Sequence, residues 1–419
     1  MRGALLARKL AAQLSATMVE RLLRAVALIL IARQVGPAAF GQYTASLALT
    51  TILAVGFALG LDVWLVRNGN RSSEREHLAQ HASTSLLIRA GLGLVWLAGL
   101  ALLAPWLDPN AYPPELFLLV ALAVWLEEIA NLVWGAFKAA LQNQTLLKFV
   151  TGMQALFVAA ILLLMVLGVR TVLPFVWLQV TVAAIHALVA IVWQIRTFGW
   201  RWAPATIVPT LRATFPFAIS TVLAMIYGRA DIALAASLLG EQAAGLYAPA
   251  VSLANALALI PTAMFFVMVP VLSREYLEQP QWAERTARRF VLVNAGLGLL
   301  AGGALALLAD PLVRVLYGPA FAPTAYLLAI LGGVLAARFL SLALVTVLVV
   351  VDRQTPRVAV QAIVAVLNIG LNLWLIRSWG LPAVAGVYVF TEWLLVVGYG
   401  FLIWLWRRES LVKASVSAA

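Results

Sequence analysis

GPAAFGQY, at residues 36–43, returns as GEQAAGLY at residues 240–247. Gly36, Gly41 and Tyr43 thus recur 204 positions later, as Gly240, Gly245 and Tyr247. Each copy joins the first and second of six long apolar segments. The glycines suit a tight turn with positive φ, and we expect the tyrosines at a membrane–water interface. A six-helix half that is duplicated in this way is typical of alternating-access membrane proteins.

The composition sets the class of protein. Of 419 residues, 63% are hydrophobic and 11% are charged, whereas a soluble domain carries about 25% charged residues. A helix that crosses a bilayer needs about 20 apolar residues, so the chain can supply about twelve. A soluble core, a nucleic-acid-binding surface and a disordered chain are excluded. The prediction is an all-α polytopic membrane protein.

The spans fall into two groups of six, which predicts two lobes around a central cavity. Residues 1–195 form the N-terminal six-helix lobe, 196–212 a cytoplasmic linker, 213–406 the C-terminal six-helix lobe and 407–419 a cytoplasmic tail. The predicted spans are 10–32, 43–66, 84–106, 115–138, 147–168, 171–195, 213–238, 243–272, 289–309, 323–350, 357–377 and 381–406.

The net charge of +12 comes from short basic clusters between the apolar segments. With twelve spans, twenty of the 29 Lys and Arg residues lie on the side of the termini and four on the other. This bias predicts that both termini are cytoplasmic, in a multi-pass protein of the cell (inner) membrane. We expect no nucleic-acid partner.

Several chemistries are not expected. The chain has no cysteine and three histidines, and His77 and His81 are expected to be a solvated loop pair rather than a metal site. No lysine follows a glycine, so a phosphate-binding P-loop is absent. The loops are too short for an extramembrane catalytic domain. We therefore expect no metal, no cofactor and no enzymatic activity.

Ionisable residues inside the predicted spans are costly, at about 2.5–3.5 kcal/mol for Arg or Asp. They fit either pairwise helix contacts, such as Glu20 with Arg24, or a hydrated cavity, and polar faces in both halves favour the cavity. Arg229 is about 200° around its helix from Asp231, so it is expected to face another surface. Asp62 and Arg89 are expected to snorkel and receive no role. The candidate cavity residues are Glu20, Asn131, Tyr227, Arg229, Arg338, Asn368 and Asn372.

Two arginines suggest a ligand. Arg21 and Arg24 lie one turn apart and fit a bidentate phosphate clamp. Buried acids can carry a coupling proton or bind Na⁺, and the candidates are Glu127, Glu128, Asp231 and Glu392. Five intramembrane arginines face six acids, so the near-neutral balance by itself does not require an anionic substrate.

Small and cyclic residues suggest local geometry. Pro249, Pro261 and Pro270 interrupt the eighth span and predict bends there, serving either motion or static packing. Gly298 and Gly302 form a GxxxG pattern that predicts a close helix–helix contact.

Ordered fragments across nearly the whole chain carry a family resemblance. The chain resembles the polysaccharide-transport (lipid-linked oligosaccharide flippase) branch of the multidrug/oligosaccharidyl-lipid/polysaccharide (MOP) exporter superfamily, which includes the MATE transporters. This resemblance implies two six-helix lobes in a V and alternating-access movement of undecaprenyl-diphosphate-linked sugars from the inner to the outer leaflet. The fragments are GPAAFGQY (36–43), GLDVWLVR (60–67), FPFAIS (215–220), RAD (229–231), GLYAPAVSLANALALIPTAMFFVMVPVLSR (245–274), LYGPAF (316–321) and LNIGLNLWLIRSWGLPAVAGVYV (367–389).

The resemblance also implies roles and partners. Arg21 and Arg24 would contact the diphosphate, and Arg229 and Asp231 match a charged pair seen in family members. A lipid-linked oligosaccharide, membrane lipids and H⁺ or Na⁺ are the expected partners, and other glycan-assembly membrane proteins are candidates. The related peptidoglycan-precursor flippases have fourteen helices, against twelve predicted here.

Two other functions stay open. A cation-coupled drug or metabolite exporter of the same superfamily would need an acidic cavity, and the arginines weigh against it. A membrane glycosyltransferase or glycan ligase would need a large periplasmic loop, whereas the loops near 106–115 and 310–322 are short and apolar.

Overall fold

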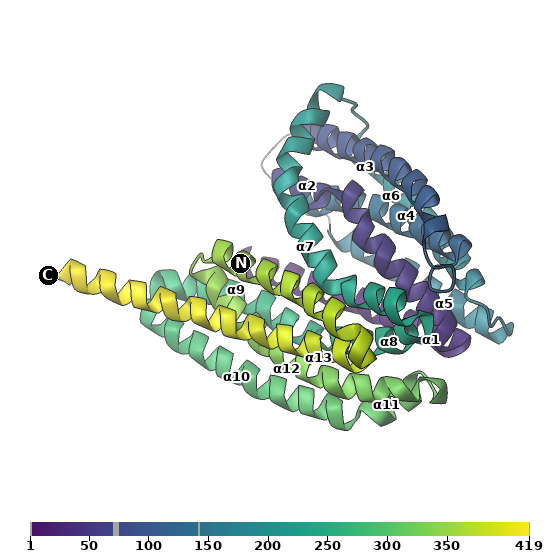
Figure 1. Ribbon diagram of the computed structural model, residues 1–419. Helices are drawn as coiled ribbons and strands as arrows, with labels where there is room; N and C mark the ends of the chain where they lie inside the picture. The colour runs from purple at the N-terminus through teal and green to yellow at the C-terminus, as the bar shows by residue number, and fades with distance from the viewer. Residues whose placement is uncertain (1, 70–74, 141–142, 419) are drawn as a thin grey trace. The chain divides into compact units, whose positions relative to one another are not determined.

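The computed structural model describes residues 2–69, 75–140 and 143–418, and all regular secondary structure in these ranges is helical (Figure 1). The α-helices are α1 Arg2–Ala58, α2 Leu61–Gly69, α3 Arg75–Leu103, α4 Pro114–Ala139, α5 Asn143–Val166, α6 Leu173–Phe198, α7 Ile207–Leu239, α8 Glu241–Leu257, α9 Leu259–Glu278, α10 Pro280–Leu307, α11 Ala309–Leu316, α12 Ala322–Val350 and α13 Gln354–Ala418. Short 3₁₀ turns lie at Ala104–Trp106, Pro204–Thr206 and Pro319–Phe321.

Glycines with positive φ divide the two longest helices. Gly36 in α1 has φ 80° and ψ 173°, and Gly380 in α13 has φ 62° and ψ −150°. Nine stretches of the described residues are long and apolar enough to cross a membrane, and these two glycines fall inside two of them. The helices confirm the predicted all-α polytopic membrane fold, and the count of about twelve spans stays a prediction.

The eighth predicted span is broken where prolines predicted a bend. Helix α8 ends at Leu257 and α9 begins at Leu259. Pro261 has no N–H to donate to the Leu257 carbonyl four residues earlier, which favours a break at this point. Pro249 and Pro270 lie inside α8 and α9 respectively. The span also continues beyond the predicted residue 272, to Glu278.

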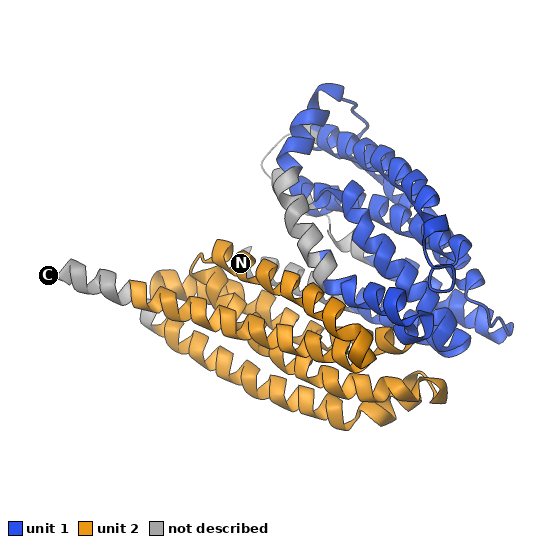
Figure 2. Cartoon of the chain, viewed as in Figure 1, with its two compact units in different colours: residues 1–245 blue, residues 246–419 orange. Residues whose placement is uncertain are grey.

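The chain forms two compact units, residues 1–245 (unit 1) and 246–419 (unit 2), coloured separately in Figure 2. In unit 1, α4 packs against α1, α2, α3 and α6. In unit 2, α12 packs against α9, α10, α11 and α13. The six-helix lobes 1–195 and 213–406, their central cavity and the cytoplasmic linker and tail stay predictions.

Within unit 1, the two copies of the repeat cross each other at their glycines. Gly240 has φ 89° and ψ 174°, nearly the conformation of Gly36. A Cβ added at Gly41 would lie 1.8 Å from the Glu241 carbonyl oxygen. A Cβ at Gly245 would lie 1.8 Å from the carbonyl oxygen of Pro37. Because Pro37 and Glu241 are themselves 204 positions apart, the contact is reciprocal, as expected for duplicated segments.

The repeated tyrosines are buried within the protein. Tyr43 and Tyr247 are 4% and 0% exposed. The Tyr43 hydroxyl donates a hydrogen bond to Gln179 Oε1 at 2.8 Å, the kind of partner that a buried tyrosine O–H needs. Burial does not fix their depth in the bilayer, so their place at a membrane–water interface stays a prediction.

Unit 2 contains the predicted GxxxG contact. A Cβ at Gly302 of α10 would lie 2.4 Å from the Gly332 carbonyl oxygen of α12, and a Cβ at Gly332 would lie 2.5 Å from the Gly302 carbonyl oxygen. Gly298 faces Ala336 in the same seam. The absence of side chains lets the two backbones approach closely, which confirms the prediction for Gly298 and Gly302.

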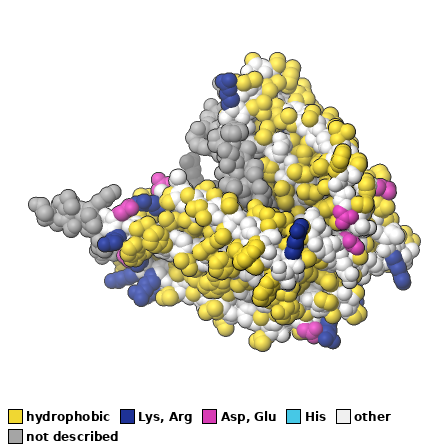
Figure 3. All heavy atoms as spheres, in the orientation of Figure 1, with side chains coloured by type: hydrophobic (Ala, Val, Ile, Leu, Met, Phe, Trp, Pro, Cys, Tyr) yellow, Lys and Arg dark blue, Asp and Glu magenta, His cyan; other side chains and the backbone are white. Residues whose placement is uncertain are grey.

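Hydrophobic side chains are spread over the whole described part of the face drawn in Figure 3, and charged ones are confined to a few places. Many large apolar residues are exposed, among them Leu102, Val166 and Leu307 at 77%, 84% and 84%. A surface of this kind fits a hydrocarbon solvent better than water, because large exposed apolar patches are rare on soluble monomers.

Candidate functional site

A buried arginine organises the polar core of unit 1. Helix α1 ends at Ala58, where Leu59 and Gly60 adopt φ 48° and 65°. The Arg89 guanidinium, from α3, donates through Nη2 to the Ala58 carbonyl oxygen at 2.6 Å. A helix C-terminus carries unpaired carbonyls and partial negative charge, so a cation there is favourable. Arg89 therefore caps the break between α1 and α2.

Arg89 also binds two carboxylates. Its Nη1 donates to Glu128 Oε2 at 3.0 Å and to the Glu128 carbonyl oxygen at 3.0 Å, and its Nη2 lies 3.5 Å from Asp62 Oδ1. Its side chain is 0% exposed. The expectation that Asp62 and Arg89 snorkel is wrong for Arg89. The break at residues 59–60 creates a carbonyl acceptor inside the unit, and the sequence gives no direct signal of that acceptor.

The neighbouring carboxylate on α4, that of Glu127, is held differently. Glu127 Oε2 lies 3.6 Å from Arg24 Nη2 of α1, a distance beyond a hydrogen bond. The Arg24 and Glu127 side chains are 54% and 29% exposed. The sequence offered Glu20 as the partner of Arg24. Glu20 does interact electrostatically with Arg24, but the ion pair seen among described residues is with Glu127.

Two more groups lie within electrostatic range of this ion pair. Tyr43 is within electrostatic range of Arg24, Glu127 and Arg229. Arg229, from α7, is within range of Arg24, Glu127 and Asp231. An interaction between residues two positions apart on one helix does not fix the face that either occupies, so the expectation that Arg229 and Asp231 face different surfaces stays a prediction.

A histidine belongs to the same region, although its isolated position in the sequence did not mark it. His186 of α6 lies within electrostatic range of Glu127 and Arg24. Its Nε2 accepts a hydrogen bond of 2.7 Å from Trp134 Nε1 of α4. Because an indole N–H can only donate, Nε2 must be the unprotonated ring nitrogen. His186 is thus held in the Nδ1–H tautomer beside the ion pair.

We name the group formed by Arg24, Glu127, Tyr43, His186 and Arg229 the N-cluster. Four helices, α1, α4, α6 and α7, bring it together. Asn131 is exposed on α4 and lies beside Glu128. Arg21 is exposed, and no ion pair of Arg21 is seen among the described residues. The side chain of Tyr227 lies outside the described residues, so its cavity assignment stays a prediction.

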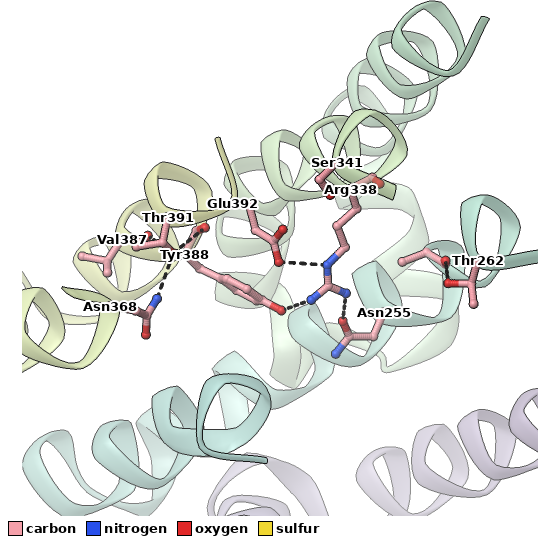
Figure 4. Close-up of polar contacts among 10 residues, drawn as sticks. Asn255, Thr262, Arg338, Ser341, Asn368, Val387, Tyr388, Thr391 and Glu392 are labelled. Atoms are coloured by element: carbon pink, nitrogen blue, oxygen red, sulfur yellow. Dashed lines mark hydrogen bonds and ion pairs between the residues drawn. The ribbon is translucent and has the colours of Figure 1, made fainter. Parts of the chain in front are cut away.

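Unit 2 holds a second polar group, drawn in Figure 4, which we name the C-cluster: Arg338, Glu392, Tyr388 and Asn255. Arg338 of α12 donates from Nε to Glu392 Oε1 of α13 at 3.1 Å. Its other nitrogens donate to Asn255 Oδ1 and to the Tyr388 hydroxyl. Glu392 is 4% exposed. The sequence placed Arg338 and Glu392 in separate roles, whereas they form one satisfied ion pair.

The two asparagines of α13 lie beside each other. Asn368 Nδ2 donates to Thr391 Oγ1 at 2.9 Å, and Asn372 Nδ2 donates to the Asn368 carbonyl oxygen at 3.0 Å. Both side chains are buried. Asp231 is also buried and accepts a hydrogen bond from the Ile232 amide at 2.9 Å. The cavity roles of the asparagines and the coupling role of Asp231 stay predictions.

The histidines of α3 also differ in their setting. His77 and His81 belong to helix α3 and not to a loop. The His81 ring packs edge-on against Trp64, with centroids 5.1 Å apart. No group of three or more potential metal ligands occurs in the part of the chain that the structure describes.

The chain is similar to known proteins in sequence and in fold. The sequence pattern of the family described as "Polysaccharide biosynthesis protein" matches residues 6–275. Two solved structures each have a TM-score of 0.75 with this chain. One is titled lipid II flippase MurJ, inward closed conformation (13% identity, 93% of this chain and 86% of that one). The other is titled inward-facing conformation of a multidrug resistance MATE family transporter of the MOP superfamily (15%, 95% and 96%).

A third structure, the eukaryotic MATE transporter AtDTX14, has a TM-score of 0.67 and 13% identity, and covers 95% of both chains. At these identities the likeness shows the fold, which is the predicted MOP-type fold. No curated protein matches the sequence.

Proposed function

Because the chain belongs to the polysaccharide biosynthesis protein family, we propose that it flips a prenyl-diphosphate-linked oligosaccharide from the inner to the outer leaflet of the cell membrane. The flipping proceeds by alternating access. Both termini lie in the cytoplasm, as the basic residues predict. The fold shared with a structure titled lipid II flippase supports movement of a lipid-linked substrate.

The observation that carries the proposal is the state of Arg24. A guanidinium within an apolar, membrane-length helix is 54% exposed and has a loose ion pair. Guanidinium groups bind phosphate oxygens through parallel N–H donors, and Arg229 adds a second positive charge in the same group. Arg24 binds the diphosphate, and Arg21 one turn earlier completes the clamp.

Coupling to H⁺ or Na⁺ belongs to the same proposal. Of the four candidate acids, Glu128 and Glu392 each accept a hydrogen bond from an arginine, which holds both carboxylates in place. Glu127 has a looser pair, and Asp231 is buried near Arg229. A carboxylate that changes its protonation or binds a cation during the cycle must lose its present partner, so Glu127 is the favoured coupling site.

The test is glycan export in a strain that depends on this chain. We expect Arg24→Ala to lower export strongly and Arg21→Ala to lower it further in combination. Arg170→Ala, at an exposed residue outside the helices, serves as the matched control. All variants are compared at equal membrane abundance. Normal export by the double variant would refute the clamp, and cationic-drug resistance without glycan export would instead support a drug exporter.

A further inference from the structure

Glu127 and Glu128 are adjacent in sequence but differ in how they are held. Glu128 accepts two hydrogen bonds of 3.0 Å, one on its carboxylate and one on its carbonyl oxygen, from Arg89, which is fully buried and also caps α1. Removing Glu128 from Arg89 would leave a buried cation short of its partner, which is strongly unfavourable. The Glu128 carboxylate is therefore fixed in place.

Glu127 can be displaced. Its carboxylate is 3.6 Å from Arg24, and both side chains are partly exposed. An exposed ion pair of this kind is weak, so breaking it costs little. Arg24 does not become buried and unpaired when Glu127 leaves, because an incoming anion takes the same position.

The surroundings of Glu127 are built for an anion. Arg24 and Arg229 both interact with it electrostatically, and Tyr43 lies in the same group. A carboxylate presents two oxygens to a guanidinium in much the same way as a phosphate does. Glu127 thus occupies the position that a phosphoryl group needs, and the negative charge of the headgroup would repel it.

We propose that Glu127 is an intramolecular competitor of the anionic headgroup for Arg24, and that Glu128 has no such role. This inference rests on the proposed function, in which Arg24 contacts the diphosphate. Without substrate, Glu127 balances the positive charge of Arg24, and the headgroup binds by displacing Glu127. Glu127 consequently sets a threshold for ligand binding. A ligand with one weak negative charge binds Arg24 little better than Glu127 does, so replacing Glu127 gives little net affinity. A diphosphate carries more negative charge and more acceptor oxygens than a carboxylate, so the same replacement is favourable.

The experiment measures binding of farnesyl diphosphate to the full chain in nanodiscs by calorimetry, with farnesol as the probe without phosphate. The variants are Glu127→Gln, Arg24→Gln and the double variant. Glu115→Gln is the matched control, because Glu115 is an exposed carboxylate in the first turn of the same helix, α4. Glu127→Asp retains the charge on a shorter side chain and provides a second reading if the glutamine variant is poorly folded.

We expect Glu127→Gln to tighten farnesyl diphosphate binding about 1.4- to 5-fold, the range that corresponds to the strength of such an ion pair. Glu127→Asp should lie between this variant and the wild type. Glu115→Gln should leave binding unchanged, and no variant should alter farnesol binding. With Arg24→Gln present, replacing Glu127 should no longer tighten binding.

Two results would overturn the inference in distinguishable ways. If Arg24→Gln weakens farnesyl diphosphate binding but both Glu127 variants leave it unchanged or weaker, Glu127 is not a competitor, and the proposed headgroup contact survives. If Arg24→Gln binds farnesyl diphosphate like the wild type, the headgroup contact itself fails and the competitor role fails with it.

Discussion

The crossing of the two repeats gives a sharp prediction for Gly41→Ala. The new methyl carbon would lie 1.8 Å from the Glu241 carbonyl oxygen and 2.8 Å from the Gly245 nitrogen. An ordinary carbon–oxygen contact is about 3.3 Å, so the backbones must separate by about 1.5 Å. Both obstructing atoms are main-chain atoms, and no side-chain rotation relieves the clash.

Overpacking of this kind typically costs about 1–3 kcal/mol, and the backbone clash places Gly41→Ala at or above the upper end. Thermal unfolding of the purified protein in detergent, followed by tryptophan fluorescence, measures the loss. Gly56→Ala is the matched control, because the same helix, α1, leaves open space around Gly56. There, the alanine should be neutral or stabilising, since glycine costs roughly 0.5–1 kcal/mol in a helix interior.

Reciprocity adds a second constraint. Gly245→Ala should destabilise the protein by a similar amount, because its methyl carbon would lie 1.8 Å from the Pro37 carbonyl oxygen. In the double variant the second alanine should cost less than the first, since one separation of the backbones relieves both clashes. If Gly41→Ala unfolds at the same temperature as Gly56→Ala, the close crossing does not exist and the reasoning is refuted.

Three further predictions use the same unfolding assay. Arg89→Met should cost about 3 kcal/mol of unfolding free energy, the lower end for a broken buried ion pair, because its partners Asp62 and Glu128 are partly exposed. Arg377→Met, at an exposed arginine, is the control. An equal or smaller loss for Arg89→Met than for Arg377→Met would contradict the capping role. Gly302→Ala should lower the free energy of unfolding by about 1–3 kcal/mol. The control is Gly303→Ala, which meets open space and should not destabilise the protein. Equal melting temperatures for the two variants would disprove the α10–α12 seam. Arg338→Met should destabilise more than Glu392→Gln, because the glutamine leaves Arg338 its contacts with Tyr388 and Asn255, and the reverse order would show that the C-cluster is not centred on Arg338.

Features set by local residue type could be predicted from the sequence. Apolar segments of membrane length define the helices, and the prolines of the eighth span mark its break. The GxxxG of α10 faces a glycine of α12, as the pattern indicates. The repeat that contains Gly41 and Gly245 can be recognised in the sequence, but the contact between its two copies depends on the fold and could not be predicted.

The polar groups were predicted less completely, because their partners come from other helices. Glu20 and Arg24 share a helical face, yet Arg24 pairs with Glu127 of α4. Arg89 was expected near solvent because the break at Leu59 and Gly60, which supplies its acceptor, has no proline to mark it. Arg338 and Glu392 are 54 residues apart, and their ion pair depends on the packing of α12 against α13.

The hydrogen bond from Trp134 to His186 has a practical consequence. The chain has three histidines, so isotope labelling of this residue type yields few imidazole signals. The ring of His186 is anchored at Nε2 and lies within electrostatic range of Arg24 and Glu127. Its Nδ1 resonance is therefore a native probe of what occupies that neighbourhood, and binding of the proposed headgroup can be tested by magnetic resonance without attaching a dye to the protein.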